Sequence, residues 1–281
     1  MQLFHRLFLS IVATLLLGLQ CAHAGTLVAT THPLYLIAQA VTQGIEQPVA
    51  LLPPASSGHD VNLRPSDRLV LKQSDFVVWF GRDYEASLKD ILEHQRNAVA
   101  LYDLKAFHRL PLRDVQGQPI KDSFDPHIWL DPANAIGIAY AIATVRAKQF
   151  PDKSRLYLQN AQKFSAHLLA VAHAEQANPP RHYWAYHDAY QYVEHTLNLK
   201  FAGALTADAE LPPSGGQLIW LSQHRPSTMA VCLFAERTPA AALVQKLSPV
   251  QSYPIDEVMA GATNFVDGWQ AIAQQFKKCT P

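Results

Sequence analysis

Short apolar runs alternate with longer segments of helical periodicity along the first part of the chain. The runs are bounded by Gly, Pro, Asp or Ser, which is typical of buried strands separated by loops. They predict strands at 26–31, 48–52, 75–80 and 98–103, with helices at 35–42, 66–73 and 84–95. Such alternation is typical of a parallel sheet with helices on both faces.

The same alternation returns after residue 180. Strands are predicted at 183–186, 201–205, 229–234 and 251–255, and helices at 189–197, 216–223, 240–247 and 266–277. Two α/β lobes with mainly parallel sheets are therefore expected.

A long helical segment separates the two halves. A helix over 133–149 is stopped at Phe150-Pro151, and a second helix begins at Asp152, a typical N-cap residue. It continues to about residue 177 without an internal Pro or Gly, which gives a length of about 40 Å. We expect an N-terminal lobe at 25–150, a linking helix at 151–178 and a C-terminal lobe at 179–281.

The first 24 residues have the features of a secretory signal peptide. An apolar stretch at 7–19, too short to span a bilayer comfortably, precedes Ala22-His23-Ala24, and we expect cleavage after Ala24. Cys21 raises lipid anchoring as an alternative, although Gln20 stands where a lipoprotein signal has a small residue. No later segment is long and apolar enough for a membrane span, so export to the periplasm is predicted.

Composition narrows the class of protein. The 23 basic and 23 acidic residues balance, which gives no indication of nucleic acid or anionic lipid as a partner. Cleavage leaves two cysteines, Cys232 and Cys279, and an even count in an exported protein suggests a disulfide. A pair of zinc ligands is the alternative, but the CxxC spacing is missing and the compartment is oxidising.

The segment 125–132, Asp-Pro-His-Ile-Trp-Leu-Asp-Pro, is the most constrained part of the sequence. The residue before a proline is pushed out of the helical region, so Ile128 to Leu130 is expected to be a short strand or extended piece. His127 would lie directly before this piece, on backbone that the prolines make stiff, and such a rigid position suits a metal ligand. One such histidine alone is more often an ordinary surface residue.

Other residues share this setting. His59, His127 and His187 each lie at a strand-to-loop junction, and Asp256 follows the last predicted strand. Ligands of open α/β sheets bind beyond the carboxyl ends of the strands. Three imidazoles and one carboxylate would complete a four-coordinate metal site. His32, at the end of the first strand, and water are the alternatives to Asp256 as fourth ligand.

These segments resemble the periplasmic zinc/manganese solute-binding proteins of ABC transporters, the cluster A-I family. The resemblance covers the whole mature chain. It rests on Gly58-His59-Asp60-Val61-Asn62-Leu63-Arg64-Pro65-Ser66-Asp67, on the segment 125–132, on His187-Asp188-Ala189-Tyr190-Gln191-Tyr192 and on Ile255-Asp256. Phe234-Ala235-Glu236 and the cysteine pair resemble the zinc branch in particular.

The resemblance implies His59, His127, His187 and Asp256 as metal ligands between two lobes joined by one long helix. It implies Zn²⁺ as cargo, because the manganese binders usually have a carboxylate at the position of His187, and nitrogen ligands favour zinc. A membrane permease and its ATPase are the implied partners, with periplasmic metallochaperones as further ones, and a monomer is expected.

Two features depart from the family pattern. The long His/Asp/Glu-rich loop of many zinc members is missing, and Gly58 stands where some members have an acidic residue that can serve as fourth ligand.

The alternative functions for this sequence are a secreted zinc metallohydrolase with a three-histidine site, and a manganese receptor or adhesin of the same fold. A hydrolase needs a general base beside an open coordination position. Glu236 is the only glutamate beside a motif, and no HExxH or GxSxG motif is present. A binding protein rather than an enzyme is therefore expected.

Overall fold

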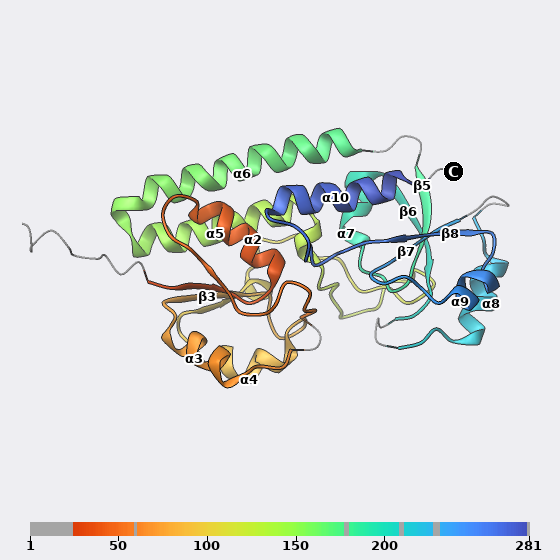
Figure 1. Ribbon diagram of the computed structural model, residues 1–281, viewed down its shortest axis with the longest axis horizontal. Coiled ribbons are helices and arrows are strands. Elements are labelled where there is room, and N and C mark those ends of the chain that lie inside the picture. The colour runs from red at the N-terminus through yellow and green to blue at the C-terminus, as the bar shows by residue number, and fades with distance from the viewer. Residues whose placement is uncertain (1–24, 59–60, 177–179, 208–210, 227–230, 280–281) are drawn as a thin grey trace, which may run out of the picture.

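The computed structural model describes residues 25–58, 61–176, 180–207, 211–226 and 231–279. Two α/β lobes lie side by side, and the long helix α6 (Ser154–Glu175) runs along both (Figure 1). The predicted fold class is confirmed. Among the described residues, no helix combines the length and apolar character needed to cross a membrane.

The N-terminal lobe is built on a four-stranded parallel sheet in the order β2-β1-β3-β4. Its strands are β1 (Leu27–Ala29), β2 (Val49–Ala50), β3 (Phe76–Trp79) and β4 (Ala98–Ala100). Every residue of β1 and β3 is buried, as expected of strands covered on both faces. The helices of this lobe are α2 (His32–Thr42), α3 (Pro65–Gln73) and α4 (Lys89–Leu92).

The C-terminal lobe repeats this topology, with the order β6-β5-β7-β8 and all strands parallel. Its strands are β5 (Arg181–Ala185), β6 (Leu199–Ala204), β7 (Val231–Ala235) and β8 (Val250–Pro254). Its helices are α7 (Gln191–Leu197), α8 (Gly215–Gln223), α9 (Ala241–Lys246) and α10 (Phe265–Lys277). In each sheet, the carboxyl ends of all four strands lie at the same edge.

Helix α5 (Pro132–Gln149) packs against α6, and both contact α2 of the N-terminal lobe. Asp131 caps α5 by accepting a hydrogen bond from the Ala133 amide at 2.8 Å, which explains the Asp-Pro pair at its start. Helix α10, near the end of the chain, packs against both α6 and α2. One hydrophobic cluster therefore includes residues of both lobes, from Leu27 in β1 to Phe276 in α10.

Residues 104–127, which we call the crossing loop, connect the N-terminal lobe to α5 by way of the C-terminal lobe. The Val115 carbonyl accepts hydrogen bonds from the Ala204 amide at 2.9 Å and from Gln217 Nε2 at 3.1 Å. Arg113 binds Asp188 through two hydrogen bonds of 2.7 Å, and its guanidinium lies 4.1 Å from the centre of the Phe201 ring. The crossing loop thus attaches one lobe to the other.

Several predicted elements differ from the observed ones in extent. The segment 84–95 contains a 3-10 turn (Ala86–Leu88) followed by the short α4, and the strand at 98–103 ends early in a 3-10 turn (Leu101–Asp103). A 3-10 turn (Pro151–Lys153) precedes α6, so Asp152 is not its N-cap. Helix α2 begins at His32, because Pro33 fits the first turn of a helix.

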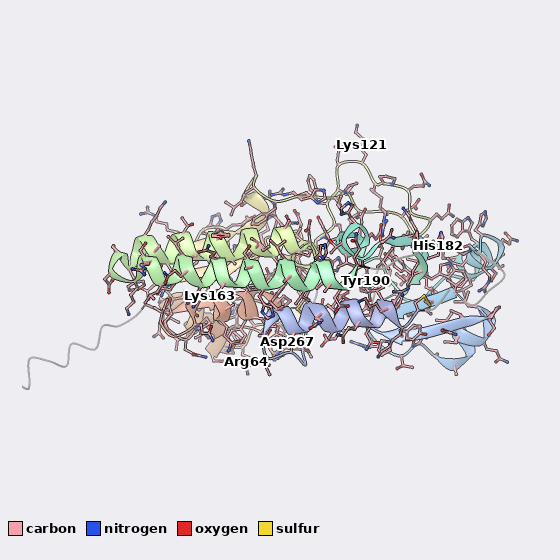
Figure 2. The ribbon with its side chains drawn as sticks, turned by 90° about the horizontal axis from the view of Figure 1, so that it is seen from above. Arg64, Lys121, Lys163, His182, Tyr190 and Asp267 are labelled. Carbon is pink, nitrogen blue, oxygen red and sulfur yellow. A yellow bond between two sulfur atoms is a disulfide. The ribbon has the colours of Figure 1, made fainter. Side chains whose placement is uncertain are left out.

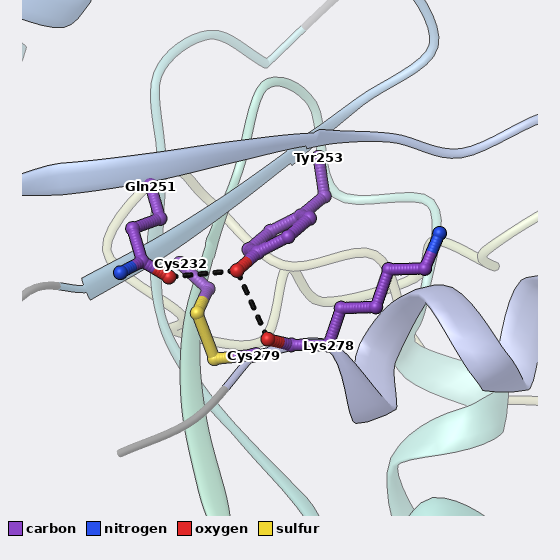
Figure 3. Close-up of a disulfide and its surroundings, with 5 residues drawn as sticks. All are labelled: Cys232, Gln251, Tyr253, Lys278 and Cys279. Carbon is purple, nitrogen blue, oxygen red and sulfur yellow. Dashed lines mark hydrogen bonds between the residues drawn. A yellow bond between two sulfur atoms is a disulfide. The ribbon is translucent and has the colours of Figure 1, made fainter.

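The predicted disulfide between Cys232 and Cys279 is present, with the two Cα atoms 5.8 Å apart. It joins β7 to the end of α10, and the Tyr253 hydroxyl lies 2.9 Å from the Lys278 carbonyl beside it (Figure 3). The two cysteines are therefore not zinc ligands.

Replacing both cysteines by serine should lower the free energy of unfolding by about 2–4 kcal/mol, because the bridge restrains two positions 47 residues apart in the unfolded chain. Urea unfolding of the variant and of the oxidised protein measures the change, and the reduced wild-type protein is the control. Equal urea midpoints for all three would contradict the expectation.

Candidate metal centre

Two imidazoles and one carboxylate meet between the lobes. One potential ligand atom from each of His127, His187 and Glu257 lies within 4.8 Å of the other two, and all three residues are buried. His127 Nε2 is 3.9 Å from Glu257 Oε1, and His187 Nε2 is 3.8 Å from Glu257 Oε2. His127 comes from the crossing loop, whereas His187 and Glu257 follow β5 and β8.

Asp125 fixes the position of His127. Its Oδ1 accepts hydrogen bonds from the His127 amide at 2.9 Å and from Nδ1 at 2.8 Å. With the proton on Nδ1, the lone pair of Nε2 faces Glu257 and is available to a metal. Burial lowers the pKa of His127, but Asp125 and Glu257 together outweigh that effect and the pKa is raised.

The prediction of a short strand or extended piece at Ile128–Leu130 was wrong, because these residues form a 3-10 turn. The Ile128 amide donates to the Pro126 carbonyl and the Leu130 amide to the His127 carbonyl, at 2.9 and 3.1 Å. The Asp125 side chain, by bonding the backbone two residues later, favours a turn over an extended conformation.

A carboxylate orients His187 in the same way. Glu236, directly after β7, has its Oε1 2.6 Å from His187 Nδ1, so Nε2 of His187 is directed towards Glu257. Burial lowers the pKa of His187, but Glu257, Glu236 and Asp188 together outweigh it and raise the pKa to about 9. Pairing a carboxylate with the second ring nitrogen is the usual support of a histidine that binds metal.

One oxygen of the buried Glu257 carboxylate has no hydrogen bond among the described residues. This oxygen is Oε2, although the side chain is only 6% exposed. Burial raises the pKa of its carboxyl, and Glu236 and Asp125 raise it further against the opposing effect of the two imidazoles. The carboxyl groups of Asp125, Glu236 and Glu257 thus lie around two largely buried imidazoles, an arrangement that favours a divalent cation.

The structure brings together only part of the predicted ligand set. His127 and His187 meet, but the carboxylate beside them is Glu257 and not its neighbour Asp256. Asp256 is exposed, and its Oδ2 accepts a hydrogen bond from the Gly261 amide at 3.1 Å. His32 is outside the group, with its Nε2 3.3 Å from the Ala262 carbonyl. His59 lies outside the described residues.

Glu257 was missed because two acidic residues stand in succession after the last strand. The sequence places both at the sheet edge, but it does not tell which of them faces the histidines. The indole Nε1 of Trp129 donates to the Glu257 carbonyl at 3.0 Å, a contact between distant segments that fixes this choice.

Tyr84 forms a wall of the site on the side of the N-terminal lobe. Its ring lies 6.2 Å from that of His127 and 5.1 Å from that of Trp129. A Cβ atom on Gly58 would lie 2.2 Å from Cε1 of Tyr84, so no side chain fits at position 58. The acidic residue that some members of the resembled family have there is excluded, and a carboxylate has to come from elsewhere.

The comparisons with known proteins all identify the same kind of protein. The family model described as "Zinc-uptake complex component A periplasmic" matches residues 27–279. The "High-affinity zinc uptake system protein ZnuA" of Haemophilus ducreyi is 26% identical over 97% of this chain and 99% of its own length. The protein of the same name from Yersinia pestis is 26% identical over 91% of each chain.

Solved structures share the fold at lower identity. "Crystal structure of ZnuA" superposes with a TM-score of 0.75 at 18% identity, and covers 91% of this chain and 98% of its own. The periplasmic zinc binding protein TroA from Treponema pallidum has a TM-score of 0.71 at 17% identity, over 90% of this chain and 97% of its own.

Gly58→Ala should destabilise the protein by about 1–3 kcal/mol, because the added methyl group overlaps the buried Tyr84 ring. In Gly58→Ala/Tyr84→Ala, the overlap is removed, so the loss should be smaller than the sum of the two single losses. Urea unfolding of the four proteins measures this coupling. Gly216→Ala is the control, since a Cβ there meets nothing within 4 Å. Additive losses would contradict the steric explanation.

Proposed function

The chain belongs to the family of periplasmic zinc-uptake complex components A, and from this membership we propose that it captures Zn²⁺ in the periplasm and delivers it to an ABC importer. The observation that carries the proposal is the convergence of His127, His187 and Glu257 within 4.8 Å. A receptor of this kind needs buried ligands that come from separate segments of the chain, and His127, His187 and Glu257 do so.

The donor set fits zinc in number and kind. In a tetrahedral site with bonds of about 2.0–2.1 Å, the donor atoms are about 3.3 Å apart. The donor atoms of His127, His187 and Glu257 lie within 4.8 Å of one another, with Glu257 Oε1 3.9 Å from His127 Nε2 and Oε2 3.8 Å from His187 Nε2, so they would move closer together around the ion. We propose His59 as the further ligand, on the resemblance of its motif. Two or three imidazoles favour Zn²⁺ over Mn²⁺.

Asp125 and Glu236 are proposed to hold the two imidazoles ready for the ion. Each engages Nδ1, at 2.8 and 2.6 Å, so that Nε2 is the donor atom on both rings. The cation would offset the repulsion among these two carboxylates and Glu257, which supports tight binding.

The other roles follow from family membership. We propose that the chain is exported by a cleaved signal peptide at 1–24 and acts as a monomer, with lobes at 25–150 and 179–281 joined by the segment 151–178. Its partners would be a membrane permease, the ATPase of that permease and periplasmic metallochaperones. We propose no enzymatic activity, because Glu236, the candidate general base, is engaged by His187 at 2.6 Å.

Glu257→Gln should weaken zinc binding about tenfold or more, since the amide is a poor ligand and does not offset the charge of the ion. Asp256→Asn is the matched control, because Asp256 is exposed and outside the group, and it should change affinity less than about threefold. Competition with a chromogenic chelator measures both. The reverse ranking would identify Asp256 as the ligand and remove Glu257 from the site.

His187→Ala should lower zinc affinity about a hundredfold and so reduce the rise in melting temperature that zinc produces in the wild-type protein. His182→Ala is the control, because His182 is an exposed histidine on the same strand, β5 (Figure 2). Calorimetry with zinc and with manganese distinguishes the two metals. Unchanged zinc stabilisation in His187→Ala would refute the proposed site.

A further inference from the structure

A cavity of about 720 Å³ opens beside the candidate metal centre. His187, Glu236 and Glu257 form one part of its wall, and Ala55 and Ser57 reach it from the N-terminal lobe. It lies beyond the carboxyl ends of β5, β7 and β8, where open α/β sheets bind their ligands. A space of this size is typical of a site for a small organic molecule.

A bare ion would use only a small part of this cavity. The metal donors lie within 4.8 Å of one another, whereas the remaining wall is formed largely by apolar side chains. These are Pro212, Pro213, Pro239, Leu243 and Val258. Apolar side chains contribute nothing to the coordination of a cation, but they do contact the carbon atoms of an organic ligand.

Besides Glu236 and Glu257, two further charged side chains line the same cavity. Arg237 directly follows Glu236, the residue that orients His187, and forms no ion pair with any described residue. A guanidinium is the preferred partner of a carboxylate. Asp256 also faces the cavity, and a carboxylate there accepts hydrogen bonds from an amine.

We propose that the cavity receives zinc together with a small chelating ligand, an α-amino acid such as histidine that binds the ion through its amino nitrogen and a side-chain nitrogen. This deepens the proposed function and rests on it. The carboxylate of the amino acid faces Arg237, the amino group faces Asp256, and the side chain lies against Pro239 and Leu243. The zinc of the complex is held by His127, His187 and Glu257, so that the two nitrogens of the amino acid make it five-coordinate and His59 is a ligand only when zinc binds alone.

The charges in the cavity select among chelates. Glu236, Asp256 and Glu257 outnumber Arg237, so a neutral or singly positive zinc–amino-acid complex is favoured over a strongly anionic one. The receptor would then bind the intact zinc–amino-acid complex, without first removing the amino acid from the ion.

Native mass spectrometry of the full mature protein tests this with zinc alone, histidine alone and preformed zinc–histidine. We expect a protein carrying zinc plus one histidine from the third sample, and no retained histidine from the second. Arg237→Gln and the cavity-filling Leu243→Trp should weaken retention of histidine at least tenfold, while the affinity for zinc alone changes less than threefold.

Arg82→Gln and Leu169→Trp are the matched controls, since both side chains are exposed and outside the cavity, and both should behave as wild type. If zinc binds but histidine only competes for it, without a ternary complex, the inference is overturned and the proposed function stands. If the protein retains zinc neither from the sample with zinc alone nor from the sample with zinc–histidine, the proposed function fails as well.

Discussion

The packing of α6 against α2, α5 and α10 holds the whole molecule together, because it gives two separate sheets one hydrophobic core. A buried polar contact reinforces it. Arg146 of α5 donates from Nε to Glu46 at 2.7 Å, and the Tyr157 hydroxyl of α6 donates to the same carboxylate at 2.7 Å. Removing one member would leave the others buried without a partner, so this network specifies how the helices meet.

A shared core fixes the relative positions of the residues that we propose as cation ligands. His127 comes from the segment before α5, and His187 and Glu257 come from the edge of the second sheet. The free energy needed to bring these groups together is therefore supplied during folding by apolar packing, and binding does not have to supply it. The carboxylates around the site repel one another in the folded protein, and a divalent ion would relieve this repulsion.

The sequence predicted the fold well because hydrophobic periodicity decides which segments are strands and helices. The repeated β-α order indicated both lobes, and the absence of Pro and Gly in 154–175 indicated the long helix. Where the prediction failed, particular side-chain contacts decided the structure. Asp125 turned Ile128–Leu130 into a 3-10 turn, and the choice between Asp256 and Glu257 depended on contacts from distant segments, such as that of Trp129 with the Glu257 carbonyl.

The crossing loop couples the two histidines mechanically. It ends in the Asp125–His127 pair, and its Arg113 also grips Asp188, the neighbour of His187, as well as Glu194. A displacement of this single segment would move both imidazoles at once, and it would also disturb the edge of the second sheet at Ala204 and the shared core at Phe107. The segment that positions the proposed ligands is therefore also the one that attaches the lobes to each other, so loss of the ion and movement of the lobes would be linked.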